Sequence, residues 1–171
     1  MKNTTADNLK WYVLTTKPKA EKQVSKRLTA SCIENFLPLQ KQLRNWHDRK
    51  KWIETPLFNS YIFVKIEDKL RSQVFEVGGL LKYLYIGGQI CILTEQEIER
   101  VRRICSYSEP VNIEQENFER GDEVEILEGH FIGLHGELLQ NKDKHKLKIS
   151  IAGLGCFATV FINKNIVRKV L

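Results

Sequence analysis

The chain has 171 residues, of which 42% are hydrophobic, 28% charged and 9% aromatic, a composition typical of globular proteins. Its length allows one medium domain or two small ones, and its 4 prolines and 10 glycines exclude a collagen-like or low-complexity protein. The 27 Lys and Arg exceed the 21 Asp and Glu, and the resulting net charge of +6 favours a polyanionic partner without identifying one.

Residues 1–21 contain no uninterrupted apolar segment, and the longest apolar stretch, near residues 80–93, is too short and too broken to span a bilayer. The 4 cysteines form no CxxC pair, so reduced core thiols are the better interpretation than a disulfide framework. We therefore expect a cytoplasmic protein with no signal peptide and no membrane partner.

The charge is unevenly divided along the chain. Residues 1–108 hold 19 Lys and Arg against 11 Asp and Glu, a net charge of +8, whereas residues 109–171 hold 8 against 10, a net charge of −2. The polar, acidic segment 108–117 contains Pro110 and is typical of a linker. The sequence predicts a basic domain over 1–107, a linker over 108–117 and a small acidic domain over 118–171.

The first domain begins with a β-rich run over residues 11–16, followed by Pro18, which is compatible with a helix start. Apolar residues at every fourth position predict a helix over about 18–32; they are Ala20, Val24, Leu28 and Cys32. Pro38 restricts any strand within the segment ENFLPLQKQ (34–42) to a sheet edge, and the basic residues 44–52 are typical of a long hairpin tip.

Residues 58–66 form the clearest strand of the sequence, because Tyr61, Phe63 and Lys65 alternate with Ile62, Val64 and Ile66. A short helix over 68–77 and a strand over 81–86 follow. Thr94 and Glu97 make a capping box that predicts a helix to about Cys105, with a core stripe of Ile98, Val101 and Cys105. This order predicts an α+β domain with helices packed on one antiparallel sheet.

The second domain shows the pattern of short strands separated by turns. The expected strands span 123–127, 136–140, 146–151, 156–162 and 166–170. Five strands in so short a segment predict a small closed or nearly closed barrel. The glycine-rich segment 128–138 is expected to be a tight loop with Phe131 or Leu134 near its tip, because it has no Gly-Lys-Ser/Thr and no helix for phosphate binding.

The segment VEILEGHFIGLHGEL (124–138) resembles a KOW motif, the strand–loop–strand unit of NusG-type transcription factors and several ribosomal proteins. The segments WYVLTTKPKAEKQV (11–24), TPLFNSYIFVKI (55–66) and GLLKYLYIGG (79–88) resemble the NusG N-terminal (NGN) domain. By their order and spacing the chain is identified as a member of the NusG type, most similar to the specialised RfaH and UpxY antiterminators. The resemblance implies an NGN-like sheet with helices, followed by a five-stranded SH3-like KOW barrel.

The resemblance also implies binding of RNA polymerase. The expected contacts with the clamp helices of the β′ subunit are Tyr61 and Phe63, with Phe58 and Ile86 nearby. The contact with the gate loop of the β subunit aligns loosely with Arg71, Ser72 and Gln73. The family's proline turn is replaced by Phe58-Asn59-Ser60. From the residues alone, the second face of the 58–66 strand could equally be covered by helices or by the second domain.

Two basic clusters are candidates for the non-template DNA strand of the transcription bubble. One comprises Lys17, Lys19, Lys22, Lys26 and Arg27, and the other Arg44, Arg49, Lys50 and Lys51 with Trp46, His47 and Trp52 interleaved. Cationic side chains give sequence-independent affinity for phosphates, and aromatic rings stack on unpaired bases. On the residues alone, a solvated basic face is the alternative; the resemblance implies nucleic-acid contact, with Lys17 and Arg27 aligned to DNA-facing positions.

The resemblance assigns the KOW domain a protein partner, ribosomal protein S10 or Rho in general NusG proteins, with Phe131, Gly133 and Leu134 as the partner loop. No catalytic motif or metal-ligand spacing stands out, so we expect a non-enzymatic, cofactor-free protein, and we expect a monomer. The resemblance to RfaH and UpxY implies that it acts in antitermination on a specific long operon, such as one for polysaccharide biosynthesis. The alternatives are a KOW-containing RNA-binding or ribosome-associated protein and, less favoured, an enzyme with an unrecognised site.

Overall fold

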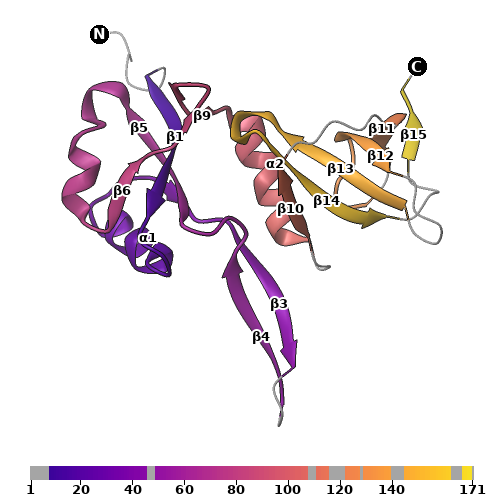
Figure 1. The fold of residues 1–171 in the computed structure, drawn as a ribbon, viewed down its shortest axis with the longest axis horizontal. Helices are drawn as coiled ribbons and strands as arrows, with labels where there is room; N and C mark the ends of the chain where they lie inside the picture. The colour runs from indigo at the N-terminus through magenta and orange to yellow at the C-terminus, as the bar shows by residue number, and fades with distance from the viewer. Residues whose placement is uncertain are drawn as a thin grey trace, which may run out of the picture. The chain divides into compact units, whose positions relative to one another are not determined.

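The structure is a computed structural model that describes residues 8–45, 49–107, 111–115, 122–127, 129–139, 145–162 and 167–170. The chain divides into two compact units. The first comprises residues 1–40 and 54–98, and the second comprises residues 41–53 and 99–171. Figure 1 shows a sheet in each of them. In the described part of the chain, no helix is long and apolar enough to cross a membrane.

The sheet of the first unit is antiparallel and centred on two long strands. Its strands are β2 (Asn35–Phe36), β5 (Tyr61–Glu67), β1 (Leu9–Thr16) and β6 (Leu80–Tyr83) in that order, with β9 (Ile92–Leu93) also paired to β1. β1 and β5 pair from Leu9 opposite Glu67 to Thr15 opposite Tyr61. The predicted strands at 11–16 and 58–66 are confirmed, and β2 takes the expected edge position before Pro38.

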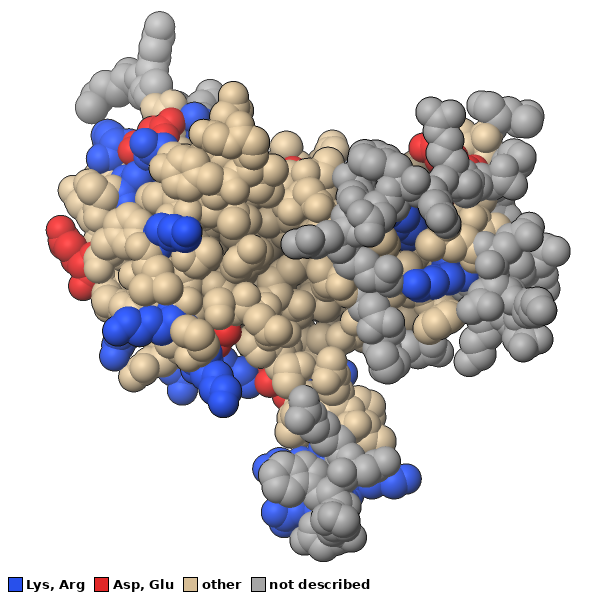
Figure 2. Space-filling view, viewed as in Figure 1, with Lys and Arg blue, Asp and Glu red and all other residues tan. Residues whose placement is uncertain are grey.

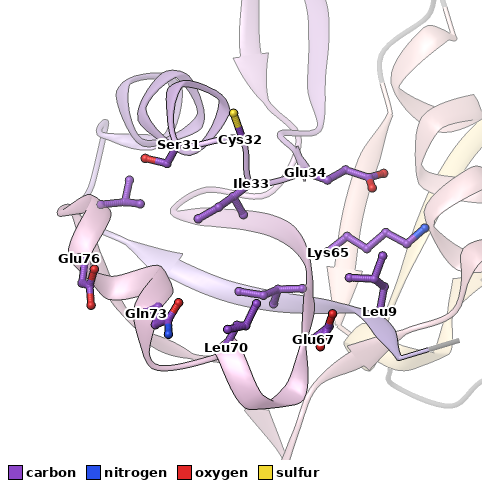
Figure 3. A pocket seen from close by; sticks show the side chains of 12 residues that line it. Leu9, Ser31, Cys32, Ile33, Glu34, Lys65, Glu67, Leu70, Gln73 and Glu76 are labelled. Carbon is purple, nitrogen blue, oxygen red and sulfur yellow. The ribbon is translucent and has the colours of Figure 1, made fainter. Parts of the chain in front are cut away.

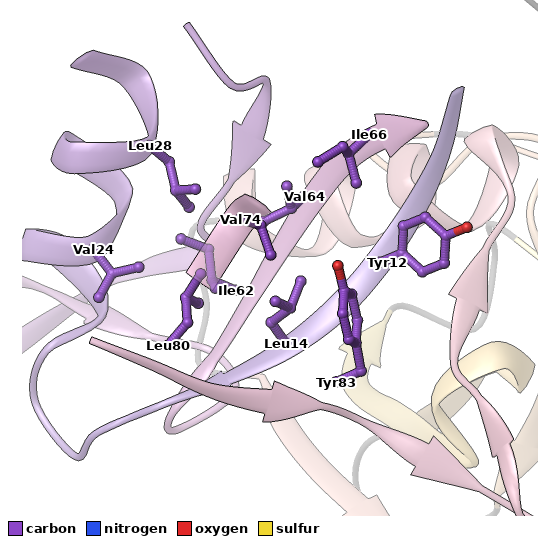
Figure 4. Close-up of a cluster of buried hydrophobic side chains, with 10 residues drawn as sticks. All are labelled: Tyr12, Leu14, Val24, Leu28, Ile62, Val64, Ile66, Val74, Leu80 and Tyr83. Carbon is purple, nitrogen blue, oxygen red and sulfur yellow. The ribbon is translucent and has the colours of Figure 1, made fainter. Parts of the chain in front are cut away.

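One face of this sheet carries the hydrophobic core of the first unit. α1 (Glu21–Ala30) packs Val24 and Leu28 against Ile62, Val64 and their neighbours, as Figure 4 shows. The helix is shorter than predicted, because Lys19 and Cys32 adopt positive φ angles of 63° and 57°, which are incompatible with an α-helix. The inclusion of Cys32 in the apolar stripe was therefore wrong: it lies beyond the helix end, exposed to solvent.

The segment after β5 differs from the expected single helix. It forms two 3₁₀ turns, η1 (Asp68–Leu70) and η2 (Gln73–Val77), and ends at Gly78 and Gly79 with φ of 73° and 92°. The expected strand at 81–86 is split between β6 and β7 (Tyr85–Ile86), which pairs with β8 (Gln89–Ile90).

The capping box at Thr94 is confirmed. The Thr94 N–H donates to Oε2 of Glu97 at 2.8 Å, and the Glu97 N–H donates to Oγ1 of Thr94 at 3.2 Å. The helix that follows is α2 (Glu95–Ser106). Ile98, Val101 and Ile104 are buried, whereas the predicted Cys105 is half-buried, so the buried face of the helix is wider than the predicted stripe and includes Ile104.

A two-stranded ribbon, the hairpin, is formed by β3 (Leu39–Asn45) and β4 (Lys50–Pro56), and it is separate from both larger sheets (Figure 1). It confirms the predicted hairpin. The side chains of Arg44, Trp46 and His47 lie outside what the structure describes.

The second unit contains a six-stranded antiparallel sheet. The order is β10 (Asn112–Gln115), β14 (Cys156–Ile162), β13 (His145–Ile151), β12 (His135–Leu139), β11 (Asp122–Ile126) and β15 (Val167–Lys169), with a 3₁₀ turn η3 (Ala152–Leu154) before β14. All five predicted strands are present. A sixth, β10, pairs with β14 inside the segment predicted to be a linker.

The predicted SH3-like barrel is not confirmed. Among the described residues the strands form an open path that ends at β10 and β15, without pairing between these two strands. The α+β fold class is confirmed by the two helices and the antiparallel sheets. The domain boundaries expected after residues 107 and 117 stay predictions.

Candidate functional site

Four aromatic rings gather on the face of β5 that is opposite the hydrophobic core. Phe36 pairs with Phe63 across β2 and β5 at a ring distance of 5.8 Å, and Phe58 lies 6.0 Å from Phe63 and 6.4 Å from Tyr61. We call Phe36, Phe58, Tyr61 and Phe63 the aromatic face. Three of its members were predicted as polymerase contacts; Phe36 was missed, and its place in a short segment before a proline gave no periodic signal.

The members of the aromatic face differ in accessibility. Phe63 is fully buried, as is its register partner Val13 on β1, and Phe58 is also buried. Tyr61 and Phe36 are half-buried. Ile86, the fourth predicted contact, lies in the β7–β8 ribbon and is 39% exposed. A partner would therefore contact Tyr61 and Phe36 first, with the ring of Phe63 as packing beneath them.

The turn that leads into β5 is held by a buried carboxylate. Oε1 of Glu21, at the start of α1, accepts a hydrogen bond from the Ser60 N–H at 2.8 Å, and the Thr16 N–H donates to the Ser60 carbonyl at 2.8 Å. Ser60 has a positive φ of 62°. The Phe58-Asn59-Ser60 turn is thus fixed by Glu21, a residue that sequence reasoning passed over because its partner lies 39 positions away.

The three residues aligned with the gate-loop contact lie at the junction of η1 and η2. Ser72 and Gln73 are exposed. Arg71 instead serves the fold: its guanidinium lies 5.8 Å from the Tyr12 ring and 5.9 Å from the Tyr83 ring, and its carbonyl accepts a hydrogen bond from the Tyr83 hydroxyl at 2.8 Å. At this junction a partner could therefore contact the exposed Ser72 and Gln73, whereas the side chain of Arg71 packs against Tyr12 and Tyr83.

Asp68 connects this junction to β1. Its carboxylate accepts hydrogen bonds from Lys10 Nζ at 2.7 Å and from the Tyr12 hydroxyl at 2.6 Å. These bonds, with that of Lys10 the larger cause, lower the pKa of Asp68. Burial and the bond to Asp68 raise the pKa of Tyr12 to about 12, and burial raises the pKa of Tyr83 to about 12.

The five predicted basic residues between 17 and 27 are all exposed; Lys22, Lys26 and Arg27 lie on α1, and Lys17 and Lys19 precede it. Lys22 Nζ donates to the Glu54 carbonyl at 2.8 Å, and Arg27 Nη1 donates to the Gly78 carbonyl at 3.3 Å, so these two side chains also brace the fold. Figure 2 shows Lys and Arg side chains over the region of α1 and on the hairpin.

The hairpin presents cationic and apolar groups together. Arg49, Lys50 and Lys51 are exposed, as predicted, and so is Lys41 on the other strand. Trp52 is 60% exposed and Leu43 is also exposed. A large aromatic ring among exposed cations can stack on an unpaired base while the cations contact phosphates. The structure therefore adds Lys41 and Leu43 to the sequence-based candidates on this ribbon.

The predicted partner loop of the second unit has an unexpected orientation. Phe131 is buried, with its ring 4.8 Å from that of Tyr107, and Leu134 is half-buried. Gly133 has a φ of 75°, and its N–H donates to the Ile126 carbonyl at 2.8 Å. Ile132, which is 56% exposed, is the apolar side chain that the loop offers to solvent.

Within the described ranges, no group of three or more His, Cys, Asp or Glu side chains could hold a metal ion. The site is therefore described by its surfaces: the aromatic face, the exposed cations of α1 and the hairpin.

Comparison with known proteins identifies relatives of this chain. Residues 9–102, more than half of the chain, match the family model described as "Transcription termination factor nusG". The chain is 27% identical over 158 residues to the transcription termination/antitermination protein NusG of Chlamydia trachomatis serovar D, covering 84% of this chain and 86% of that protein. It is 25% identical over 173 residues to the NusG protein of Rickettsia typhi, covering 93% of this chain and 89% of that protein.

A solved structure shares the fold. The structure titled "Domain interaction in Thermotoga maritima NusG" aligns with a TM-score of 0.54 and 23% identity, over 97% of this chain and 99% of that one. The predicted resemblance is confirmed at the level of the family by the family model. Because that model matches more than half of the chain, from β1 to most of α2, the chain belongs to the NusG family of transcription termination/antitermination proteins.

Proposed function

We propose that this chain binds RNA polymerase and promotes processive, antiterminated elongation of a specific long operon, such as one for polysaccharide biosynthesis. The observation that carries the proposal is the aromatic face on β5 in a chain of the NusG family. Phe58 and Phe63 are buried on this face, whereas Tyr61 and Phe36 stay partly accessible to a partner. The resemblance to RfaH- and UpxY-type factors favours the operon-specific role.

Docking on the clamp helices of the polymerase β′ subunit would use Tyr61 and the neighbouring rings of the aromatic face. Aromatic side chains commonly dominate the energy of protein interfaces. Ser72 and Gln73 would meet the gate loop of the β subunit. Binding favours elongation if the chain has higher affinity for the closed clamp than for the paused conformation, because a ligand shifts an equilibrium only by its differential affinity.

The basic groups of the first helix and the hairpin would contact the non-template DNA strand. Lys17, Lys19 and Lys26 are exposed on the helix side, and Arg49, Lys50 and Lys51 on the hairpin. The KOW-like second unit would meet a protein partner, ribosomal protein S10 or Rho, through the loop that contains Ile132. In this proposal the protein acts as a cytoplasmic monomer.

The docking claim is tested by measuring the affinity of purified RNA polymerase for Tyr61→Ala, with Leu81→Ala as the control because Leu81 is an exposed apolar residue on β6. We expect Tyr61→Ala to weaken binding by about tenfold or more, as for an interface hot spot. Phe63→Ala is unsuitable, because removing a fully buried Phe costs about 3–5 kcal/mol of stability. Equal affinities of the Tyr61 variant and the parent would refute docking through this face.

A transcription read-through assay past a terminator on the operon's own leader separates two roles. Increased read-through supports antitermination, whereas increased Rho-dependent termination would assign the chain to the opposite role within the same family.

A further inference from the structure

A hollow of about 790 Å³ lies in the first unit, and none of the four residues of the aromatic face lines it. It is bounded by the segment after α1, the ends of β1 and β5, and the η1–η2 segment (Figure 3). Its apolar wall comprises Leu9, Ile33, Ile66, Leu70 and Val77. Figure 3 shows Ile33 and Leu70 pointing into the hollow from opposite sides. A hollow of this size can receive a large apolar side chain with part of its backbone.

The wall contributed by the segment after α1 is held rigidly. Asn35 Nδ2 donates to the Ile33 carbonyl and to Thr29 Oγ1, each at 3.1 Å, while Asn35 Oδ1 accepts from Ser25 Oγ at 2.7 Å. The Lys65 N–H donates to the Glu34 carbonyl at 2.9 Å. Because these bonds fix the wall before any ligand arrives, little conformational entropy is lost there on binding.

The rim of the hollow has the opposite charge to the rest of its domain. The charged residues that line it are three carboxylates, of Glu34, Glu67 and Glu76, and one ammonium group, that of Lys65. Lys65 is paired with Glu95, and Glu67 is paired with Lys69 at 2.7 Å. Glu34 and Glu76 are exposed and form no ion pair with any described residue. Two carboxylates therefore remain uncompensated in a unit whose residues 1–40 and 54–98 hold 11 Lys and Arg against 9 Asp and Glu, a net charge of +2.

We propose that this hollow is a second docking site, for a segment of a protein partner in which a large apolar residue is adjacent to Lys or Arg. The apolar side chain would fill the space between Ile33 and Leu70, and the cation would lie near Glu34 or Glu76. The carboxylates disfavour nucleic acid, because they repel phosphates. This inference goes beyond the proposed function and does not rest on it, since the site shares no side chain with the aromatic face.

The test is an NMR titration of the full chain with two blocked dipeptides, N-acetyl-Leu-Arg-amide and N-acetyl-Leu-Glu-amide. We expect the amide signals of Ile33, Leu70 and Val77 to shift saturably with the first peptide. The second peptide should bind at least about fivefold more weakly, because its Glu is repelled by the two exposed carboxylates that attract the Arg of the first. Shifts confined to other residues, or equal affinity for the two peptides, would overturn the proposal.

Variants locate the two parts of the site. At least one of Glu34→Gln and Glu76→Gln should weaken binding of the Leu-Arg peptide by about two- to fivefold, the range for exposed ion pairs. Glu54→Gln should not, because Glu54 is exposed but does not line the hollow. Leu9→Gln should weaken the binding of both peptides. The NMR spectrum of each variant without peptide shows whether that variant is folded. If the Glu34 and Glu76 variants bind the Leu-Arg peptide with the same affinity as the parent, the two carboxylates do not bind the cation and the proposal is wrong. If spermidine causes the same signal shifts, the site binds a free polycation rather than a protein segment.

Discussion

The buried carboxylate of Glu21 accepts a hydrogen bond from the Ser60 N–H at 2.8 Å, and it thereby ties the first turn of α1 to the turn before β5. Ser60 has a φ of 62°, a conformation that L-residues other than glycine seldom adopt. The position of Tyr61, the most accessible predicted contact on β5, thus depends on a residue of the first helix. This relationship joins the basic helix to the aromatic face within one unit.

Glu21→Ala is expected to destabilise the first unit by about 1–3 kcal/mol, because the Ser60 N–H loses its partner. Urea unfolding followed by tryptophan fluorescence measures the change. The matched control is Glu54→Ala, which removes an exposed carboxylate of β4 and should leave the midpoint nearly unchanged. Ser60→Gly should be neutral or stabilising, because glycine adopts positive φ without strain. A Glu21→Ala midpoint equal to that of the parent would show that the bond contributes nothing.

Alkaline pH is expected to destabilise the first unit between about pH 10 and pH 12. Tyr12 and Tyr83 have a pKa of about 12 in the fold against an ordinary 10.0, so the folded state retains protons that the unfolded state loses in this range. The contribution is complete below pH 10 and is lost as the pH rises through 12. Tyrosinate absorbance during titration measures both groups, and Tyr12→Phe should remove one of the two late transitions. Titration of all tyrosines near pH 10 would contradict this.

Acidic pH is also expected to destabilise the first unit, through Asp68 of the same network. The pKa of Asp68 is lowered from 3.8, so its contribution is present at neutral pH and is lost as the pH falls below that value. Asp68→Asn should abolish this acid-dependent loss and lower the pKa of Tyr12, because the hydroxyl then faces an amide rather than a carboxylate. Chemical denaturation at several acidic pH values distinguishes the variant from the parent; parallel curves would be inconsistent with the network.

Gly136 on β12 is expected to tolerate no side chain. A Cβ at this position would lie 2.6 Å from the Lys148 carbonyl oxygen and 2.9 Å from Leu147 Cδ1, both on the neighbouring strand. Gly136→Ala should therefore cost about 1–3 kcal/mol by overpacking. The neighbouring exposed residue His135 provides the control, since His135→Ala leaves this contact untouched. Thermal unfolding measures the midpoint temperature of each variant. Equal midpoints for Gly136→Ala and His135→Ala would mean that β12 and β13 can move apart to accept the methyl group at little cost in stability.

The hairpin is expected to bind single-stranded DNA through its cations and Trp52. Arg49→Glu, Lys50→Glu and Lys51→Glu together should weaken binding and reduce the slope of log affinity against log salt by about 0.7 for each phosphate that is no longer neutralised. Trp52→Ala should weaken binding without changing this slope, because stacking releases no counterions. Lys82→Glu, an exposed cation on β6, and Leu81→Ala are the respective controls. If the variants cross-link to the DNA of a transcription bubble as efficiently as the parent, these residues do not contact DNA.

Local sequence patterns predicted several of the helices and strands of this protein. The alternation in residues 61–66 predicts β5, and the Thr94–Glu97 capping box predicts the start of α2; both are local patterns, and both are confirmed. The five strands of the second unit were predicted for the same reason. The sequence also identified the family, because the motif segments stand in the family's order and the family model matches residues 9–102.

Only the tertiary structure decided which residues meet and which are accessible. Phe36 joins Phe63 through strand pairing, Phe131 turns inward while Ile132 is exposed, and two carboxylates border an apolar hollow in a basic region. None of these has a local signal, because each depends on contacts between residues that are distant in the chain. Periodicity reports which residues can be buried together, whereas long-range packing selects the surface that remains for a partner.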